Sequence, residues 1–373
     1  MRRPRLLFYA VNGLGLGHVT RLLGLARAVR LQSPEAEVLF LTTTEAAHVI
    51  YSEGFAALKL PSRAAAAAGR LRHDSWLRLS QTVVWNAISA FDPHCLVVDT
   101  FAAGTLQELL PILRWPLRKV FIFRAQRPER AHDPFLQSTL RLYDLILVPH
   151  EQDSENVPTP EGVASLWTGP MLLRERSELL QREQARAMLG LAPDAELGLL
   201  VLGGGGEPEM QAARTQLREA MAAVQSPIQW IELQGPLTRY DPGEYSSAPA
   251  HDSWRTLRDV HPLMIYLRAF DCAIAAAGYN TTHELQAAAV PCALWPFARD
   301  VDDQESRVAQ LSAAGRVLCI GSGAAENRVP ELAAAMRSLA DASTRERLRA
   351  AMHGASTRNG THIGAEAILS LLA

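Results

Sequence analysis

The chain has 373 residues, of which 48% are hydrophobic, and its formal net charge is −2 at pH 7. This length suits two domains that each bury a core, and the near-neutral charge argues against a general nucleic-acid binder. No apolar run approaches the roughly 20 residues of a membrane helix, and the run near the N-terminus is too short for a signal peptide. Residues 5–11 instead predict a buried first strand that leads into a glycine-rich loop at 12–18.

That loop, NGLGLGH, is not the dinucleotide fingerprint, because its glycines alternate and the second strand, predicted over 37–42, does not end in an acidic residue. NAD binding is therefore disfavoured. A helix is predicted over 19–30, so His18 lies at its start and Arg21 one turn along it. The imidazole of His18 is suited to act as a general base that deprotonates the hydroxyl of a substrate, the acceptor, and Arg21 is suited to bind a phosphate. The simpler alternatives are a loop-capping histidine and a solvated arginine.

The rest of the first half alternates helices and strands, which is typical of a parallel sheet covered on both faces in an α/β domain. The expected elements are helices over 44–53, 76–90 and 101–113 and strands over 56–59, 95–99, 119–123 and 145–148. Asp99 ends one strand, and Arg124 and Arg127 follow another, at the edge where open α/β sheets bind ligands. We expect Asp99 to partner His18 or the acceptor. The basic, partly apolar segment 62–78 is expected as a surface helix or, alternatively, as a lip for an anionic or lipid-linked acceptor.

A loop rich in turn formers over 151–161 and the Gly169-Pro170 pair predict a crossover between two domains, because they break both regular periods. We place the first domain at 1–168 and the second at 169–352. The segment 353–373 is expected to form a C-terminal helix that packs back on the first domain.

Four consecutive glycines, Gly203 to Gly206, follow a strand predicted over 197–202. A helix over 177–189 precedes that strand, and another over 209–224 follows the glycines. Such a turn lets the main chain press against a bulky group, and its cost in chain entropy disfavours a plain flexible loop.

The most informative pattern lies at residues 271–307. It consists of an apolar strand over 272–277, the turn GYNTT, a helix over 283–289, a second strand over 290–296 and an acidic loop. Asn280 or Thr281 is placed to cap this helix, whose free N–H groups and positive dipole end suit a pyrophosphate. Glu284 suits both hydroxyls of a ribose, and Asp303 with Gln304 suits the hydroxyls of a sugar.

These motifs together resemble the GT-B glycosyltransferases, in particular the MurG-like group (family 28) and a less-studied bacterial branch of it. The resemblance rests on Gly-x-Gly-His-x-x-Arg, the Thr-Gly-x-Pro-type linker and Gly-Tyr-Asn-Thr-Thr-x-Glu followed by a Gln loop. It implies two Rossmann-like parallel-sheet domains facing a cleft. The implied donor-binding residues are Gly15, Gly17, Gly203, Gly204, Gly205, Leu263, Met264, Gly278, Tyr279, Asn280, Thr281, Thr282, Glu284, Asp303 and Gln304. The acceptor-side candidates are Asn12, Arg21, Arg124 and Arg127.

The reaction implied by the resemblance is an inverting transfer of a hexose-type sugar from a nucleotide diphosphate sugar, with UDP expected from family frequency. His18 or Asp99 would take the proton of a hydroxyl acceptor, which is a small metabolite or a lipid-linked molecule. The helix end at 280–282 would neutralise the leaving diphosphate, with neither a metal nor another cofactor. A nucleotide-sugar hydrolase and a catalytically silent binding protein stay open as alternatives. A UDP-sugar 2-epimerase shares the fold, but its cluster of acid and base residues is not evident.

The expected partners are thus a nucleotide sugar and an unknown acceptor, with no nucleic acid and at most peripheral membrane contact. The four cysteines lack metal-ligand spacing, and three lie in apolar runs. They indicate buried thiols in a reducing, cytoplasmic compartment.

Overall fold

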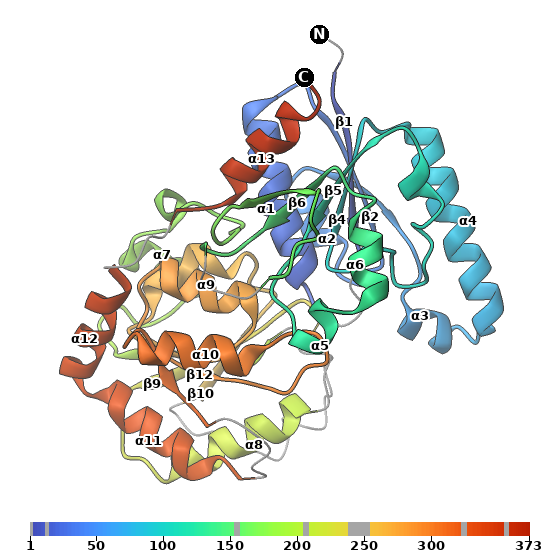
Figure 1. Ribbon diagram of the computed structural model, residues 1–373. Coiled ribbons are helices and arrows are strands. Elements are labelled where there is room, and N and C mark those ends of the chain that lie inside the picture. Colours follow the sequence, from blue (N-terminus) through green and yellow to red (C-terminus); the bar gives the residue numbers. More distant parts are fainter. Residues whose placement is uncertain are drawn as a thin grey trace. The chain divides into compact units, whose positions relative to one another are not determined.

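The computed structural model describes residues 3–11, 15–152, 157–203, 209–237, 254–321, 327–353 and 358–373 (Figure 1). The chain separates into two compact units. Unit 1 comprises Met1–Leu173 and Arg358–Ala373, and unit 2 comprises Arg174–Thr357. The chain therefore leaves unit 1 after Leu173 and returns at Arg358.

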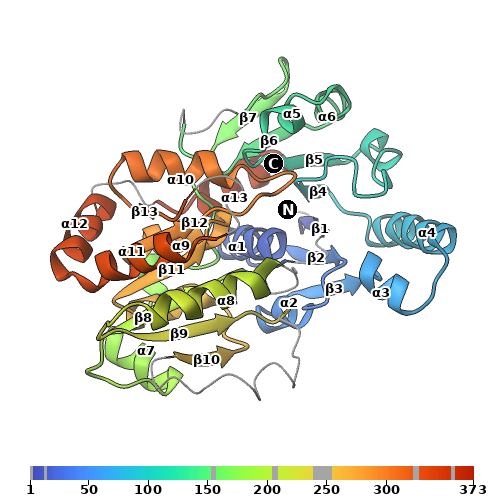
Figure 2. The same ribbon diagram turned by 90° about the horizontal axis from the view of Figure 1, so that it is seen from below.

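Unit 1 holds a seven-stranded parallel sheet in the order β3-β2-β1-β4-β5-β6-β7, which can be followed in Figure 2. Its strands are β1 (Arg5–Ala10), β2 (Glu37–Thr42), β3 (Ala56–Lys59), β4 (Cys95–Asp99), β5 (Arg118–Ile122), β6 (Leu145–Val148) and β7 (Ala164–Trp167). Its helices are α1 (Gly17–Gln32), α2 (His48–Ser52), α3 (Arg63–Ala68), α4 (His73–Phe91), α5 (Pro128–Ala131), α6 (Pro134–Leu140) and α13 (Thr361–Ser370), with a 3₁₀ turn at Ile112–Arg114.

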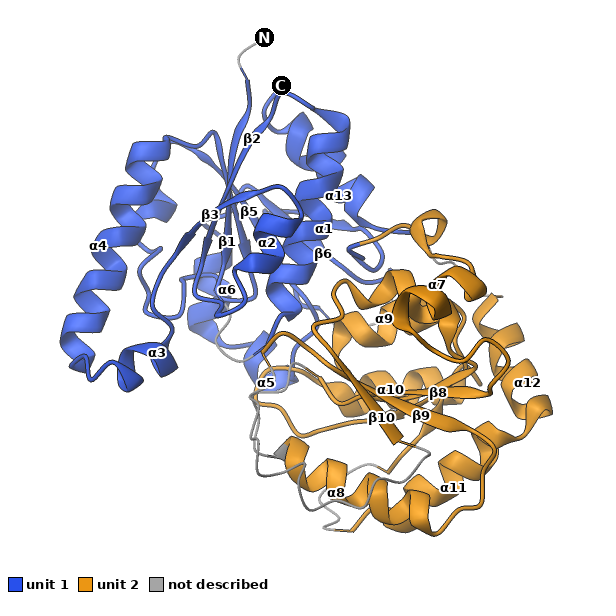
Figure 3. Cartoon of the chain, turned by 180° about the vertical axis from the view of Figure 1, so that it is seen from behind, with its two compact units in different colours: residues 1–173, 358–373 blue, residues 174–357 orange. Residues whose placement is uncertain are grey.

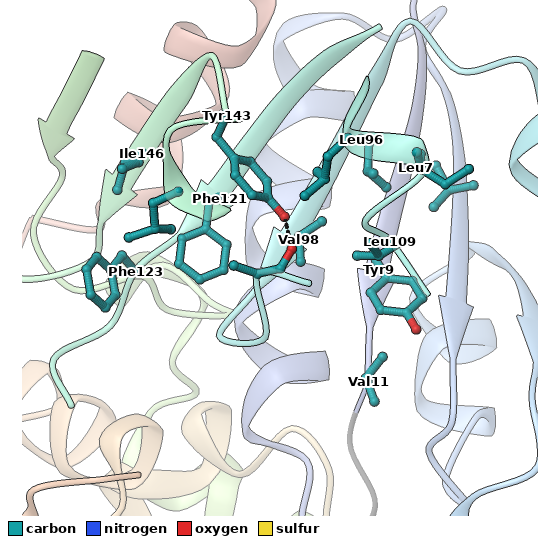
Figure 4. Close-up of a cluster of buried hydrophobic side chains, with 14 of the residues drawn as sticks. Leu7, Tyr9, Val11, Leu96, Val98, Leu109, Phe121, Phe123, Tyr143 and Ile146 are labelled. Atoms are coloured by element: carbon teal, nitrogen blue, oxygen red, sulfur yellow. Dashed lines mark hydrogen bonds between the residues drawn. The ribbon is translucent and has the colours of Figure 1, made fainter. Parts of the chain in front are cut away.

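The central strands of unit 1, such as β1, β4 and β6, are buried on both faces, which explains their nearly continuous apolar sequences. On one face Tyr9, Val98 and Phe121, from three neighbouring strands, join a cluster that includes Val84 of α4 (Figure 4). Alternate residues face the other side, where the Phe8 ring stacks on Phe40 with 5.3 Å between ring centres. Helices pack on both faces of the sheet and thereby fix the positions of the carboxyl ends of the strands.

Unit 2 holds a six-stranded parallel sheet in the order β10-β9-β8-β11-β12-β13. Its strands are β8 (Leu197–Val201), β9 (Gln229–Gln234), β10 (Trp254–Arg258), β11 (Cys272–Ala276), β12 (Cys292–Trp295) and β13 (Leu318–Cys319). Its helices are α7 (Arg182–Leu189), α8 (Glu209–Ala222), α9 (Tyr279–Ala287), α10 (Gln304–Ala313), α11 (Val329–Ala340) and α12 (Ala342–His353), with 3₁₀ turns at Arg176–Glu178 and Leu263–Ala269. The prediction of two α/β domains with parallel sheets is therefore confirmed.

Helices cover both faces of the unit 2 sheet, with α8 and α11 on one side and α7 on the other (Figure 3). The side of α8 and α11 is filled by apolar residues such as Leu217, Leu332 and Trp230. The Trp230 ring lies so close to Gly198 that a Cβ there would stand 2.4 Å from a ring atom. Glycine is required at position 198 by packing.

The last helix, α13, packs against α1 within unit 1 (Figure 1). Gln32 Nε2 donates to the carbonyl of His362 at 3.0 Å. The buried Asn359 binds the segment that leads out of unit 1, because its side chain accepts from the Leu172 N–H at 3.0 Å and donates to the Leu172 carbonyl at 3.2 Å. The outgoing and returning segments are thus tied together at unit 1.

The helix predicted over 101–113 is wrong, since the structure has turns there and a 3₁₀ turn only from Ile112. Thr100, Gly104 and Gln107 have φ values of 65°, 79° and 57°, which are left-handed and interrupt a right-handed helix. The buried Glu108 carboxylate accepts the Leu106 N–H at 2.6 Å and replaces the missing helical bonds.

Other predicted boundaries also shift. The helix predicted over 177–189 divides into a 3₁₀ turn and α7, since the Gln181 side chain caps α7 and separates the two. The helix predicted over 44–53 is reduced to α2. The edge strands β7 and β10 were not predicted from the sequence, because neither is fully buried and their residues do not alternate clearly.

None of the helices within the described residues is both long and apolar enough to cross a bilayer. Cys95, Cys272 and Cys292 are buried free thiols, as predicted, whereas Cys319 is exposed. Burial raises the pKa of the Cys292 thiol to about 12. Across the part of the chain that the structure describes, no group of three or more His, Cys, Asp or Glu residues is arranged to hold a metal ion.

Candidate functional site

Unit 1 has a topological switch point between β1 and β4. From β1 the chain builds β2 and β3 to one side, and β4 begins the other side. Ligands of open α/β sheets bind at the carboxyl ends of the strands at such a point. His18 follows β1 in the first turn of α1, and Asp99 is the last residue of β4, so both lie at this edge.

His18 and Asp99 form a pair that Arg21 completes. His18 Nδ1 lies 3.4 Å from Asp99 Oδ2, and Arg21 Nη2 lies 2.9 and 2.7 Å from the two carboxylate oxygens. Burial raises the pKa of Asp99, but the charge of Arg21 and the contact with His18 outweigh this effect and hold the pKa well below its usual range. Asp99 is therefore ionised at neutral pH.

The sequence correctly predicts that His18 and Asp99 lie together, but it places Arg21 among groups that meet a phosphate. The Arg21 side chain is 2% exposed and its guanidinium is directed at Asp99. Thr100 Oγ1 also donates to Asp99, at 2.8 Å, and the ring centre of Phe101 lies 5.8 Å from that of His18.

Arg124 and Arg127 follow β5, whose residue Ile122 pairs with Asp99, so they lie at the same edge of the sheet. Arg124 is 7% exposed and Arg127 is half-buried. Asn12, the remaining acceptor-side candidate, lies outside the described residues. The described part of this edge is thus rich in cationic side chains, which suits an acceptor with an anionic group.

On the donor side, Gly15 and Gly17 stand at the start of α1. A Cβ at Gly17 would meet no atom within 4 Å. Packing therefore does not require glycine at that position.

Unit 2 has its own switch point, between β8 and β11, since β9 and β10 lie to one side and β12 and β13 to the other. Gly203 follows β8, and Gly278 follows β11, its parallel neighbour. Gly203 has a φ of 103°, a conformation that favours glycine. Gly204 and Gly205 lie outside the described residues.

Helix α9 begins at Tyr279 with Gly278 as its N-cap, so the expected cap at Asn280 or Thr281 is wrong. No side chain caps this end, which is the positive end of the helix dipole. The hydroxyl Oγ1 of Thr282, in the same turn, is fully buried and has no hydrogen-bond partner among the described residues. Both features favour an anionic ligand at this end of α9.

Gly278 has ordinary backbone angles, with φ −64° and ψ 149°. A Cβ at this position would meet no atom within 4 Å. Neither the backbone conformation nor packing within the chain requires glycine at position 278. The close approach of a bound group to the main chain would require it.

Glu284 lies one turn farther along α9 and is 7% exposed. Within the described residues its carboxyl group has neither a hydrogen-bond nor an ion-pair partner, and burial raises its pKa to about 8. Burying an unpaired carboxylate is unfavourable, so this group is better suited to binding a ligand than to stabilising the fold.

The acidic loop after β12 is organised by its own side chains. Asp303 caps α10 by accepting the Ser306 N–H at 3.0 Å. Gln304 Oε1 accepts the Phe297 N–H at 3.0 Å, and Gln304 Nε2 donates to Asp302 Oδ2 at 3.2 Å. Asp303 and Gln304 therefore hold the loop in shape, and direct contact with sugar hydroxyls stays a prediction.

The two base-pocket candidates have different environments. Met264 is fully buried and belongs to the core, whereas Leu263 begins its 3₁₀ turn half-buried. Leu263 is thus the more accessible of the two. The sequence did not single out Arg307, which is 3% exposed and bonded to the carbonyl of Ala277 beside α9. Its spacing of three residues from Gln304, one helical turn, is the signal that could have identified it.

No family model matches the chain, and no curated protein sequence matches it. Solved structures do match it over almost the whole length. The spinosyn rhamnosyltransferase SpnG complexed with thymidine diphosphate superposes with a TM-score of 0.64 at 16% identity and covers 99% of this chain and 100% of its own. MurG of Acinetobacter baumannii gives 0.61 at 15% identity, over 98% of this chain and 99% of its own.

The chain has the GT-B fold. The fold was predicted from the sequence, and the likeness to MurG confirms that prediction. The GT-B fold also occurs in a Listeria monocytogenes protein assigned as a UDP-N-acetylglucosamine 2-epimerase, with a TM-score of 0.66 at 15% identity, over 99% of this chain and 95% of its own. The GT-B fold alone therefore does not decide the reaction, which must be argued from the site.

Proposed function

We propose that the chain is an inverting glycosyltransferase that moves a hexose-type sugar from a nucleoside diphosphate sugar, expected to be a UDP-sugar, to a hydroxyl acceptor. The observation that carries this proposal is the buried, unpaired carboxyl of Glu284, one turn beyond the uncapped N-terminus of α9 at a switch point. A carboxylate accepts both hydroxyls of a ribose, and the helix end binds the diphosphate.

In this proposal His18 acts as the general base. With Nδ1 directed at Asp99, the other ring nitrogen, Nε2, takes the proton of the acceptor hydroxyl. The acceptor oxygen attacks the anomeric carbon, whose bond to the diphosphate oxygen breaks in one displacement, so the configuration inverts. The ionised Asp99 stabilises the imidazolium that forms, as a carboxylate does for histidine in other catalytic pairs.

The leaving diphosphate gains negative charge as the sugar departs. The N-terminal N–H groups of α9 neutralise that charge, so we propose a reaction that needs no metal ion. Arg124 and Arg127 would meet an anionic group of the acceptor, which is a small metabolite or a lipid-linked molecule. The three buried thiols suit the reducing cytoplasm, where nucleotide sugars would be the donors.

A labelled-sugar assay tests this proposal. Radiolabelled UDP-, TDP- and GDP-sugars are incubated with the protein and with polar and lipid extracts as acceptor sources, in the presence of EDTA. We expect label in a new product, and a rate lower by about 10²–10⁴ in His18→Ala with unchanged nucleotide binding. Free labelled sugar without any acceptor would indicate the hydrolase, a C2 epimer would indicate the epimerase, and nucleotide binding without turnover would indicate a silent binding protein.

A further inference from the structure

Arg307 of α10 is a buried cation that contacts the turn in front of α9. Its side chain is 3% exposed. Its Nη1 donates to the carbonyl oxygen of Ala277 at 3.0 Å, and its Nη2 donates to Asp302 Oδ1 at 2.8 Å. Ala277 immediately precedes Gly278, the N-cap of α9. Arg307 therefore joins the acidic loop to the turn at which the diphosphate is proposed to bind.

The contacts of Asp302 fix the guanidinium in this position. The second oxygen of Asp302, Oδ2, accepts from Gln304 Nε2 at 3.2 Å, and Gln304 Oε1 accepts the Phe297 N–H at 3.0 Å. Arg307 is thus held at the end of a chain of hydrogen bonds that starts from the backbone after β12. A guanidinium with both ends bound is pre-organised, and it loses little conformational freedom when a ligand arrives.

The bond to Ala277 has a direct consequence for the direction of the Gly278 N–H. In a trans peptide the C=O and the following N–H point in opposite directions. Because the Ala277 carbonyl points to Arg307, the Gly278 N–H points away from α10. Position 278 also leaves room for a close approach of a ligand, since a Cβ there would meet no atom within 4 Å.

The charge of Arg307 also acts on this end of α9. The guanidinium carbon lies 5.9 Å from the ring centre of Tyr279, the first residue of the helix. The positive charge adds to the partial charge of the helix N-terminus, although Asp302 offsets part of it. Burial raises the cost of a cation, and a role toward an anion explains why an apolar side chain does not fill this place.

We propose that Arg307 is a positioning residue for the diphosphate of the donor, which orients the Ala277–Gly278 peptide and adds positive charge behind the N-terminus of α9. The inference rests on the proposed donor site. It specifies that recognition of the diphosphate depends on a side chain two elements away, on α10, and that Arg307 acts on the phosphates and not on the nucleoside.

The proposal is tested by comparing Arg307→Met with the wild type. Both proteins are titrated with UDP, TDP and GDP by calorimetry, and with the matching nucleosides by NMR. Methionine fills a similar volume without charge or donor. We expect the dissociation constant of the responding diphosphate to rise about tenfold or more, because a bond to a charged group is lost, while that of its nucleoside stays within about twofold. Arg307→Lys, which keeps a charge and a donor, is expected to recover most of the diphosphate affinity.

Melting curves of each variant without ligand show whether it is folded, and Arg307→Gln, which also lacks the charge, takes the place of Arg307→Met in every comparison if Arg307→Met is unfolded. An equal loss for diphosphate and nucleoside, or no loss for either, would overturn the role of Arg307 and leave the donor site intact. If Arg307→Lys binds the diphosphate no better than Arg307→Met does, the role is likewise overturned. A wild-type protein that binds none of the three diphosphates would overturn the proposed function itself.

Discussion

At the scale of single residues, Glu284 makes the stability of the protein depend on pH. Its pKa is about 8 in the folded protein against an ordinary 4.5. The folded state therefore keeps a proton that the unfolded chain loses, and stability falls as the pH rises from about 4.5 through 8. The proposed donor site accounts for this cost, because it assigns Glu284 to a ligand.

Glu284→Gln is expected to remove this pH dependence, because an amide does not titrate. The variant should melt at a higher temperature than the wild type at pH 9, and this difference in melting temperature should be much smaller at pH 5. Each unit of pKa shift corresponds to about 1.4 kcal/mol, and each kcal/mol to roughly 2–4 °C for a domain of this size. Melting curves of both proteins at the two pH values test this prediction. An equal difference in melting temperature at pH 5 and pH 9 would show that the carboxyl is not buried as described.

Gly278→Ala separates a requirement of the ligand from a requirement of the fold. The backbone angles at position 278 suit alanine, and its Cβ would meet no atom within 4 Å. The melting temperature should change little, since the restriction of the unfolded chain by alanine, about 0.4–1 kcal/mol, is offset by the lower preference of alanine for an N-cap position. Affinity for the diphosphate should fall about tenfold or more, because the methyl group would lie where the phosphates are proposed to approach the main chain.

Gly198→Ala is the matched control for that substitution. Its Cβ would stand 2.4 Å from the Trp230 ring, so it should lower the melting temperature clearly. An unliganded Gly278→Ala protein that melts as early as Gly198→Ala would show that position 278 serves the fold.

At the scale of elements, the turns after β4 depend on one buried carboxylate. The Tyr9 hydroxyl donates to Glu108 Oε1, and the Leu106 N–H donates to Glu108 Oε2. The Trp85 indole N–H donates to the Glu108 carbonyl at 2.7 Å. These bonds join β1, α4 and the segment that begins with Thr100 beside Asp99.

Glu108→Ala is expected to destabilise the protein by about 2–5 kcal/mol, because it leaves the buried Tyr9 hydroxyl and the half-buried Leu106 N–H without a partner. Tyr9→Phe removes the Tyr9 hydroxyl, so in a protein that already carries this substitution Glu108→Ala leaves one donor fewer without a partner. The double variant should therefore lose less than the sum of the two single losses, with a coupling of about 0.5–3 kcal/mol. Urea unfolding of the four proteins measures the cycle, and strictly additive losses would contradict the pairing.

The same segment shows the limit of prediction from sequence at this scale. Strands such as β4 and β11 were predicted well because their apolar runs are buried on both faces. The helix predicted over 101–113 failed because Glu108 has good helix propensity but a tertiary role, and left-handed residues such as Thr100 leave no sequence signature. The start of α9 at Tyr279 was missed because Gly278, with no capping side chain, serves as the N-cap.

At the scale of the whole molecule, the order of the strands determines much of the site. Carboxyl ends of adjacent parallel strands share an edge, so the proximity of His18 and Asp99 and the position of the turn at Gly278 at the edge of its sheet follow from recognising α/β units. The contacts of Arg21 with Asp99, and of Arg307 with Ala277, do not follow, because helical spacing gives the direction of a side chain but not its depth or partner. The sugar and the acceptor are not specified by any of these patterns.

The measurement that tests the account most directly is a thermal-shift titration of the wild type and Glu284→Ala with UDP, TDP and GDP. The account predicts that one diphosphate raises the melting temperature of the wild type by several degrees at about 100 times its dissociation constant, where binding adds roughly 2.7 kcal/mol. It predicts that Glu284→Ala, folded and with an unliganded melting temperature at least as high at pH 8, loses that shift. No shift of the wild type with any diphosphate, or an equal shift in both proteins, would contradict a donor site on α9.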